Sequence, residues 1–452
     1  MHELGVNVVR MPEPAPARQT PPMELLEPVV WSQLLELFRR VNSDYLYWDD
    51  FKHKRMPAGV DPRDAWSALK LARGINRKMT PVVDKAGEHF WYTRTDELER
   101  VLHVIDQQAG GNVSASVSGL SAHEKRRYLI SSLMEEAIAS SQIEGAVTTR
   151  RVAKEMLRTS RPPRDRAEKM ILNNYVTISR ISELLDQPLT PALIISLQES
   201  LTHDALDHPE DCGRLRSDED DIVIAADDGA GGQVLHVPPP AASIRPELKR
   251  FCAYANSGDG AFEHPVLKAV VLHFWLAYLH PFADGNGRTA RAVFYLFMLK
   301  NGYWLFEYLS ISRVILDRRA KYYRSFLYSE VDDADLTYFI TFNLHAIEKA
   351  LTELWAYLDR KSKDDAAIRA RVKRDSALNY RQRAVLIRAL REPDTEFTID
   401  SHRASHSVSY GTARNDLLGL QGLGYLELHK RGKEYVFRSS GTIADSLGNG
   451  TD

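Results

Sequence analysis

Apolar residues recur mostly at three- and four-residue spacings along this chain, which is the pattern of helices with one buried face. The first such run begins at Trp31, Leu34, Leu35 and Phe38 and continues to about residue 108. Further runs cover residues 122–144, 168–185, 191–203, 265–279, 288–300 and 336–374. Residues 265–279 are apolar on nearly every face, which predicts a buried central helix. We therefore expect a mainly α-helical fold.

One convincing β pattern interrupts the middle of the chain. Residues 222–225 and 234–237 are short runs of β-branched and apolar residues on either side of a turn rich in Asp and Gly. Three prolines at 238–240 end the second run. This pattern predicts a small β-hairpin, which we call the flap.

Changes in composition divide the chain into segments. Residues 1–28 carry six of the 21 prolines and predict an extended, mobile arm without regular structure. Residues 29–110 form a helical N-terminal region, and the Gly/Ser-rich residues 110–119 suit a linker. A central core follows over 111–360, whose first helix, about 122–145, begins after Ser121 and ends before Gly145. A helical linker at 361–374, a small domain at 375–440 and a tail at 441–452 complete the chain.

The small domain resembles a winged helix-turn-helix. Helices are predicted at 380–391 and 409–420, and two strands at 425–429 and 434–438 enclose a basic turn. Residues 371–438 carry 13 basic and 8 acidic side chains, a surplus of five positive charges. Such basic groups suit DNA phosphates, although winged helices also serve as protein-docking modules. Both roles stay open.

Composition sets outer limits on function. The 452 residues are 44% hydrophobic and 27% charged, which excludes wholesale disorder. The net charge of −2 excludes a general attraction of the chain to nucleic acid or membranes. Two cysteines, Cys212 and Cys252, exclude a disulfide scaffold and a four-cysteine zinc site. With no apolar span or signal core, we expect a cytoplasmic protein that does not contact membranes.

The densest chemical signal lies between the buried helix and the next one, at residues 280–291. Gly285, Asn286 and Gly287 accept positive φ angles, so their backbone N–H groups can form an anion-binding nest. The helix that follows directs its N-terminal amides and dipole toward the same place. Arg288 and Arg291, three residues apart, can grip a polyphosphate.

Two further residues of this segment suit phosphate chemistry. A lone carboxylate such as Asp284 commonly holds Mg²⁺ beside phosphates, with water and phosphate oxygens completing the coordination. His280 ends the buried helix, and an imidazole with a reference pKa of roughly 6.5 can accept a hydroxyl proton near neutral pH. The segment thus predicts a site that binds a phosphate chain next to a general base.

Two other interpretations of these residues are weaker. His273 and His280 are seven residues apart, whereas helical zinc ligands are usually one turn apart. Residues 285–290, with Glu307 about twenty residues on, satisfy a dinucleotide-binding fingerprint. That fingerprint requires a preceding strand, and a long helical pattern precedes it here.

Residues 280–291 match every fixed position of the Fic signature, His-x-Phe-x-Asp/Glu-Gly-Asn-Gly-Arg-x-x-Arg, so the chain resembles the Fic family. Residues 213–216, the flap and Tyr322-Tyr323 also resemble features of the Fic core, over about residues 121–358. Ser140 through Gly145 matches the family's inhibitory pattern, Ser/Thr-x-x-x-Glu-Gly/Asn. Its position before the core indicates the class with an N-terminal inhibitory helix.

The resemblance implies an autoinhibited protein adenylyltransferase that moves AMP from ATP to a Ser, Thr or Tyr hydroxyl of a protein, possibly itself, and releases pyrophosphate. It implies Mg²⁺ at Asp284, a general base at His280, a core-facing anchor at Phe282 and an inhibitory residue at Glu144. Phosphates would be bound by Gly285, Asn286, Gly287, Arg288 and Arg291, with Asn286 at the α-phosphate and Arg291 as the partner of the inhibitor. Ile222, Val223, Ile224, Val234 and Leu235 of the flap would pair with the target, and Tyr322 and Tyr323 would lie toward the nucleobase.

Three alternatives stay open at this point. The same core could remove AMP from a modified protein or transfer another phosphate-bearing group. The chain could instead be a DNA-binding regulator whose core senses a nucleotide. Whether the protein forms a homodimer is also open.

Overall fold

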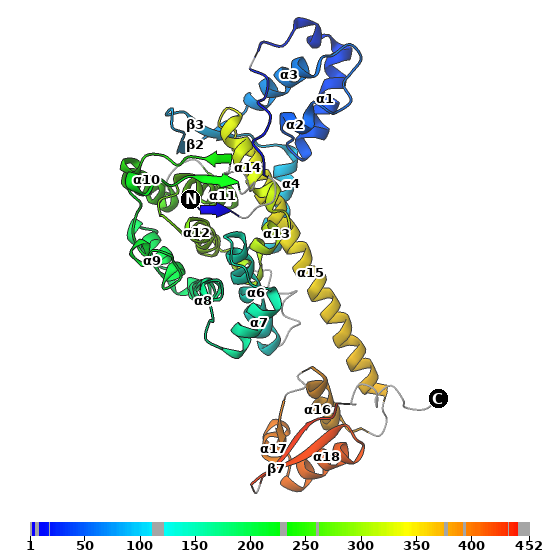
Figure 1. Cartoon of the computed structure of the whole chain (residues 1–452). Helices are drawn as coiled ribbons and strands as arrows, with labels where there is room; N and C mark the ends of the chain where they lie inside the picture. Colours follow the sequence, from blue (N-terminus) through cyan, green and yellow to red (C-terminus); the bar gives the residue numbers. More distant parts are fainter. Residues whose placement is uncertain are drawn as a thin grey trace. The chain divides into compact units, whose positions relative to one another are not determined.

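The structure is a computed structural model that describes residues 2–4, 9–17, 19–110, 122–226, 233–258, 262–374, 378–391, 395–432 and 434–441. The chain forms two compact units, Met1–Leu354 and Trp355–Asp452. The boundary falls within the long helix α15, Thr337–Arg374 (Figure 1). The predicted Gly/Ser linker beyond Gly110, the capping residue Ser121 and most of the tail lie outside the described residues.

The first unit begins with two short elements in the arm that was predicted to lack regular structure. These are β1, His2–Leu4, and the 3-10 helix η1, Met23–Leu26. The helical region then contains α1, Pro28–Ser43; α2, Trp48–Phe51; α3, Pro62–Gly74; and α4, Asp96–Ala109. Between α3 and α4 lies an unpredicted antiparallel hairpin, β2, Lys78–Val83, and β3, His89–Tyr92. Its strands are rich in the β-branched and aromatic residues that favour a pleated surface.

The N-terminal region is fastened to the rest of the first unit through buried polar contacts. Lys70 of α3 is 2.9 Å from Asp332 and 3.2 Å from Asp335, and all three side chains are buried. Arg73 stacks on Tyr45 and donates to the hydroxyl of Tyr338. Removing one member of such buried pairs is strongly destabilising, so this region is built into the unit.

Helices make up most of the core that carries residues 280–291. They are α6, Ala122–Ile143; α7, Arg150–Thr159; α8, Arg166–Ser179; α9, Pro191–Thr202; α10, Ala241–Asn256; α11, Pro265–Leu279; α12, Asn286–Lys300; α13, Ile311–Asp317; and α14, Arg319–Val331. Short 3-10 helices lie at Ile181–Leu184 (η2), Pro209–Asp211 (η3), Asp218–Asp220 (η4) and Trp304–Tyr308 (η5). As predicted, α11 is buried on nearly every face, and it packs along α12 in the middle of the core (Figure 1).

The flap is confirmed, with a first strand one residue shorter than predicted and a second strand shifted by one residue. Strand β4 spans Ile224–Ala226 and pairs antiparallel with β5, Gln233–His236. Ile222 and Val223 lie before β4 and outside it, because η4 and the left-handed Asp221 turn the chain just upstream. Strand β1 adds to β4 in parallel, so the sheet order is β1-β4-β5. Residues 227–232 of the predicted turn lie outside the described part.

The second unit has the element order of a winged helix. Helices α16, Tyr380–Arg391, α17, Ile399–His406, and α18, Tyr410–Gly422, accompany strands β6, Phe397–Thr398, β7, Leu426–Arg431, and β8, Glu434–Ser439. The strands form a sheet of order β6-β8-β7. Helix α17 and strand β6 were not predicted.

Several basic residues of the second unit are paired with carboxylates. Arg431 and Arg438 both contact Glu396, and Arg381 contacts Asp416. These pairs reduce the positive charge available to DNA phosphates, and Lys433 of the predicted wing tip lies outside the described residues. DNA or protein contact through this unit stays a prediction.

Across the ranges that the structure describes, no helix combines the length and apolar character needed to cross a membrane.

Candidate active site

A cavity opens where the 280–291 loop, the end of α6, the flap and α14 meet. It is lined by Glu144, Ile224, Leu235, His236, Ala277, Tyr278, His280, Ala283, Asp284, Gly285, Asn286, Gly287, Arg291, Tyr322, Tyr323, Phe326, Leu327 and Glu330. Most of the predicted site residues therefore share one cavity, although they come from segments far apart in the sequence. The exceptions are Ser140, Gly145, Ile222, Val223, Val234 and Arg288, which do not line it.

Two left-handed residues shape the loop between α11 and α12. His280 (φ 48°) caps α11, and Gly285 (φ 85°) precedes the first residue of α12. Phe282 is fully buried, as predicted, and anchors the loop in the core. The Asn286 side chain accepts from the Phe282 N–H (3.0 Å) and donates to the Phe282 carbonyl (2.7 Å). The amide thus closes the loop, and the predicted contact of Asn286 with a phosphate stays a prediction.

The imidazole of His280 has a defined orientation at the cavity wall. Its Nδ1 lies 3.3 Å from the Ala277 carbonyl oxygen. Because a carbonyl oxygen only accepts hydrogen bonds, Nδ1 carries the proton in this contact. The neutral ring then has its basic lone pair on Nε2, the nitrogen suited to accept a proton from a substrate hydroxyl.

Asp284 is held between two arginines. Its Oδ1 accepts from Arg288 Nη2 (3.0 Å) and from the Gly285 N–H, and its Oδ2 lies 3.4 Å from Arg166 Nη2. Arg288 is fully buried and also donates to the Leu201 carbonyl at the end of α9 (3.1 Å). Arg288 does not line the cavity, and its guanidinium contacts Asp284. The predicted contact of Arg288 with phosphates stays a prediction.

We expect Arg288→Met to lower the free energy of unfolding by about 3 kcal/mol, because it removes one member of a buried ion pair and leaves the Leu201 carbonyl without this donor. Arg166→Met is the matched control, since Arg166 contacts the same carboxylate but its side chain is 40% exposed. Its loss should cost less than about 1 kcal/mol. Urea unfolding measures both. Equal losses in the two variants would show that burial of Arg288 does not matter.

The predicted inhibitory segment, Ser140 through Gly145, contacts Arg291, the second arginine of the 280–291 segment. Arg291 Nη2 donates to Glu144 Oε1 (2.9 Å) and to the Ser140 carbonyl (2.8 Å), while its Nε donates to Ser140 Oγ (2.9 Å). Glu144 Oε1 also lies 2.2 Å from the point that a Cβ on Gly287 would occupy. The carboxylate is thus pressed against the first turn of α12. Only glycine at 287 leaves room for it.

Helix α6 is fixed to the core on its other faces. The buried Glu136 accepts hydrogen bonds from the Ser312 N–H (3.0 Å) and from Ser310 Oγ (3.2 Å) beside the start of α13. Asn174 of α8 donates to the Ala137 carbonyl and to Ser141 Oγ. These contacts hold the end of α6, and with it Glu144, at the cavity. Gly145 (φ 93°) then turns the chain away from the helix, as predicted.

The predicted aromatic side of the cavity is buried and uncharged. The Tyr322 hydroxyl lies 3.0 Å from His273 Nε2. Burial raises the pKa of Tyr322, and burial together with the charge of Glu144 raises the pKa of Tyr323 to about 12. Burial, helped by the charge of Arg291, lowers the pKa of His273 to about 3. This wall therefore offers neutral rings.

His273 predicts a pH dependence of stability. As the pH falls below about 6.5 the unfolded chain protonates this histidine, whereas the folded chain does so only near pH 3. Stability is therefore lost as the pH falls through this window, by about 2 kcal/mol at pH 5. Urea unfolding at pH 7 and pH 5 should show this loss in the wild type and its absence in His273→Gln. The same loss in both proteins would contradict it.

The sequence pattern assigned no role to Arg216. In the structure, its hydrogen bonds support the start of the 280–291 loop. Its side chain donates to the carbonyls of His280 (2.7 Å), Leu279 (3.3 Å) and Pro239 (2.6 Å), and its backbone N–H donates to Pro281. A buried cation at the C-terminal end of α11 suits the negative end of the helix dipole. The sequence signal for Arg216 was the resemblance of residues 213–216 to the Fic core. No sequence signal marked His236 and Glu330, whose side chains lie 2.7 Å apart in the cavity wall.

Comparisons with known proteins agree with this geometry. Residues 188–298 match the model of the Fic/DOC family. The chain is 35% identical over 127 residues to the protein adenylyltransferase Fic of Drosophila ananassae, covering 27% of this chain and 24% of that protein. It is 34% identical over 96 residues to the protein adenylyltransferase Fic of Nematostella vectensis, covering 21% and 20%. The chain thus spans about a quarter or less of the length of these curated relatives.

One solved structure shares the fold over most of its length. A Fic family protein from Desulfovibrio desulfuricans G20 aligns with a TM-score of 0.53 and 22% identity, covering 77% of this chain and 98% of that one. The chain is related, over part of its length, to protein adenylyltransferases. Residues 188–298, which include the cavity loop, therefore belong to a Fic/DOC domain, and the chain shares the fold of a Fic family protein.

Proposed function

We propose that the chain is an autoinhibited protein adenylyltransferase that transfers AMP from ATP to a protein hydroxyl. One observation carries the proposal: an internal carboxylate, Glu144, occupies a place built for an anion. It is bound by the buried Arg291 guanidinium and rests against the first turn of α12. Helix N-termini and buried arginines are the groups that bind phosphates. The terminal phosphate of ATP would take the place of this carboxylate.

The residues around that place have complementary roles in the proposal. Arg291 and the first turn of α12 bind the phosphate chain. His280 Nε2 accepts the proton of the target hydroxyl as its oxygen attacks the α-phosphorus, and pyrophosphate leaves. The neutral rings of Tyr322 and Tyr323 face the nucleoside. Such transfer depends mainly on positioning and on stabilisation of charge.

Asp284 fits the Mg²⁺ that the family resemblance implies. Its carboxylate lines the cavity, and its Oδ2 lies 3.4 Å from Nη2 of the part-exposed Arg166. Within the described residues no group of three His, Cys, Asp or Glu side chains could hold a metal by itself. Phosphate oxygens would therefore supply further ligands, as is usual for Mg²⁺. The ion would neutralise charge on the phosphates.

Labelled ATP tests the reaction class. We expect the Glu144→Gly protein, incubated with Mg²⁺ and a panel of candidate acceptor proteins, to incorporate label from the α-phosphate and none from the γ-phosphate. Label from the γ-phosphate would instead indicate a kinase. Release of AMP from an already adenylylated protein, without net incorporation, would favour the reverse reaction.

A further inference from the structure

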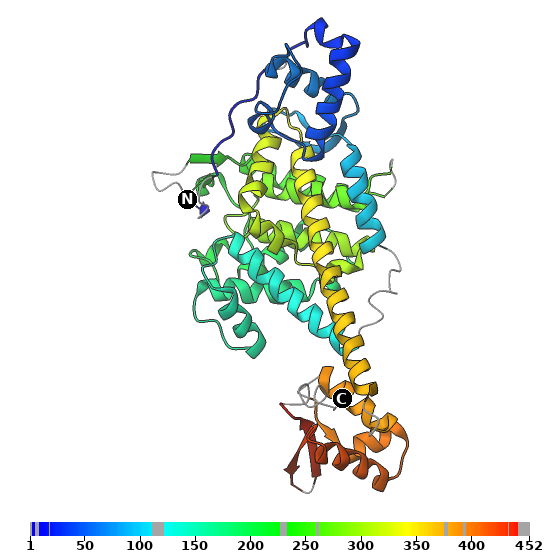
Figure 2. The same cartoon turned by 90° about the vertical axis from the view of Figure 1, so that its right-hand side faces the viewer.

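The proline-rich arm lies on the flap. Residues His2, Glu3 and Leu4 of β1 pair in parallel with Ile224, Ala225 and Ala226 of β4. Figures 1 and 2 both show the dark blue N-terminal strand beside the green flap strands. An unpaired strand edge is a ready template for another extended chain. Here the chain's own N-terminus covers that edge.

A second part of the arm packs on the rim of the cavity. Val9 is 2% exposed and forms an apolar cluster with Leu327, Leu235 and Tyr323. Those three residues also line the cavity that contains His280. The Met11 N–H donates to the side chain of Gln233 at the start of β5 (3.3 Å). The arm therefore combines backbone pairing on the flap with a side chain buried at the cavity rim.

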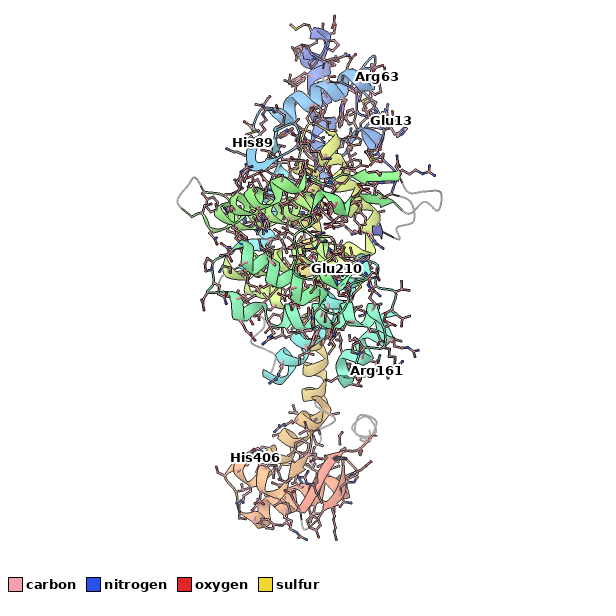
Figure 3. All side chains as sticks on the ribbon, turned by 60° about the vertical axis from the view of Figure 1, so that its left-hand side comes forward. Glu13, Arg63, His89, Arg161, Glu210 and His406 are labelled. Carbon is pink, nitrogen blue, oxygen red and sulfur yellow. The ribbon has the colours of Figure 1, made fainter. Side chains whose placement is uncertain are left out.

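The arm is anchored at its far end. The Tyr47 hydroxyl donates to the Glu13 carbonyl (2.8 Å) and accepts from the Ala15 N–H (3.1 Å), and Lys52 pairs with the Glu13 carboxylate. Figure 3 shows Glu13 beside the N-terminal helices. These contacts keep residues 9–11 near the cavity, which gives the arm a high effective concentration at the flap.

The part of the arm that lies on the flap and the cavity rim has no side-chain hydroxyl. Residues 1–19 contain no Ser, Thr or Tyr. A hydroxyl acceptor is what the proposed reaction requires, so this segment can occupy the flap without becoming a product. The segment pairs with the flap through its backbone and buries an apolar side chain, as a docked peptide would. It lacks the hydroxyl oxygen that the proposed reaction requires.

We propose that the N-terminal arm acts as a built-in pseudosubstrate: residues 2–4 occupy the outer edge of β4, and Val9 occupies the cavity rim formed by Leu235, Tyr323 and Leu327, where an extended target segment would otherwise lie. Backbone pairing supplies the affinity and the apolar rim binds one side chain, as in other cases of strand addition. A protein target must displace the arm before its hydroxyl reaches His280. The role of the arm as a pseudosubstrate rests on the proposed function. The binding experiment that tests the inference does not depend on that function.

Binding of a fluorescein-labelled peptide of residues 2–15 to the full-length chain tests the inference by fluorescence anisotropy, without ATP. In Val9→Asp a buried carboxylate without a partner should release the arm, so the peptide should bind at least tenfold more tightly than to the wild type. Arg10→Asp is the matched control, because it places the same residue at the adjacent, exposed position. It should behave like the wild type.

Two further proteins keep the test decisive. A chain that begins at Met11 vacates the site without a core substitution and should bind the peptide as Val9→Asp does. Adding Leu235→Asp, at a half-buried rim position, should abolish that binding. Equal affinity for all proteins, no saturable binding, or binding that survives Leu235→Asp would overturn the inference. None of these results depends on AMP transfer, so a failed docking site and a failed transferase are distinguishable.

Discussion

Glu144→Gly should raise the rate of AMP transfer about 100-fold or more. Breaking a buried ion pair costs about 3–5 kcal/mol, and a site held 99:1 in its inhibited form needs less than about 3 kcal/mol, at about 1.4 kcal/mol per factor of ten. The Glu144–Arg291 pair alone is therefore strong enough to inhibit the site. The substitution also removes the carboxylate that rests against Gly287. Transfer is measured with α-labelled ATP under initial-rate conditions.

Glu135→Gly is the matched control for this effect. Glu135 lies on α6, whose last residue directly precedes Glu144, and it pairs with Arg150 and Lys154 outside the cavity. The substitution removes ion pairs with the more exposed Arg150 and Lys154 and introduces the same residue, so it separates release of the site from loosening of α6. We expect a change of less than about threefold. A rise as large as that of Glu144→Gly would assign inhibition to the helix as a whole.

His280→Ala should abolish transfer in the Glu144→Gly background while leaving ATP binding intact. General base catalysis contributes about 10²–10⁴ in rate, and Nε2 is the basic nitrogen of this imidazole when Nδ1 donates to the Ala277 carbonyl. The substitution leaves the proposed phosphate-binding groups, such as Arg291, unchanged. The transfer rate and the dissociation constant of ATP are measured on the same preparation.

Two controls separate the proton transfer from the fold of the loop. His280 adopts a left-handed conformation that alanine tolerates poorly, whereas asparagine accepts it. His280→Asn should therefore keep the thermal stability of the parent and still lose transfer. His208→Ala, at a side chain 75% exposed, should change neither. Transfer by His280→Asn within tenfold of the parent would remove this residue from the mechanism.

The loop at residues 280–291 was readable from the sequence because its residues are contiguous. The turn-forming residues at 285–287, the apolar helix before them and the arginines after them specify a loop between two helices, and the structure has it. The Glu144 pattern was readable for the same reason. What the pattern could not supply was side-chain direction. The sequence pattern predicts phosphate contacts for both Arg288 and Arg291. In the structure, Arg288 is buried and donates to Asp284, four residues before it.

Contacts between distant segments were beyond local patterns. The pairing of residues 2–4 with β4 joins segments more than 200 positions apart, and nothing in the first residues indicates a partner. Arg166 and Arg216 reach the 280–291 loop from other elements by contacts that only the tertiary fold creates. The β2–β3 hairpin was not predicted because apolar residues recur at helical spacing in the segments before and after it. In each case packing decided an outcome that propensity left open.

Intact-mass measurement of the full-length Glu144→Gly protein, after incubation with ATP and Mg²⁺, tests the central claim most directly. Our account predicts a gain of one AMP on the protein itself or on an added acceptor, with release of pyrophosphate and no gain in the Glu144→Gly/His280→Ala protein. Unchanged masses with ATP bound, or a gain of a single phosphate, would contradict it.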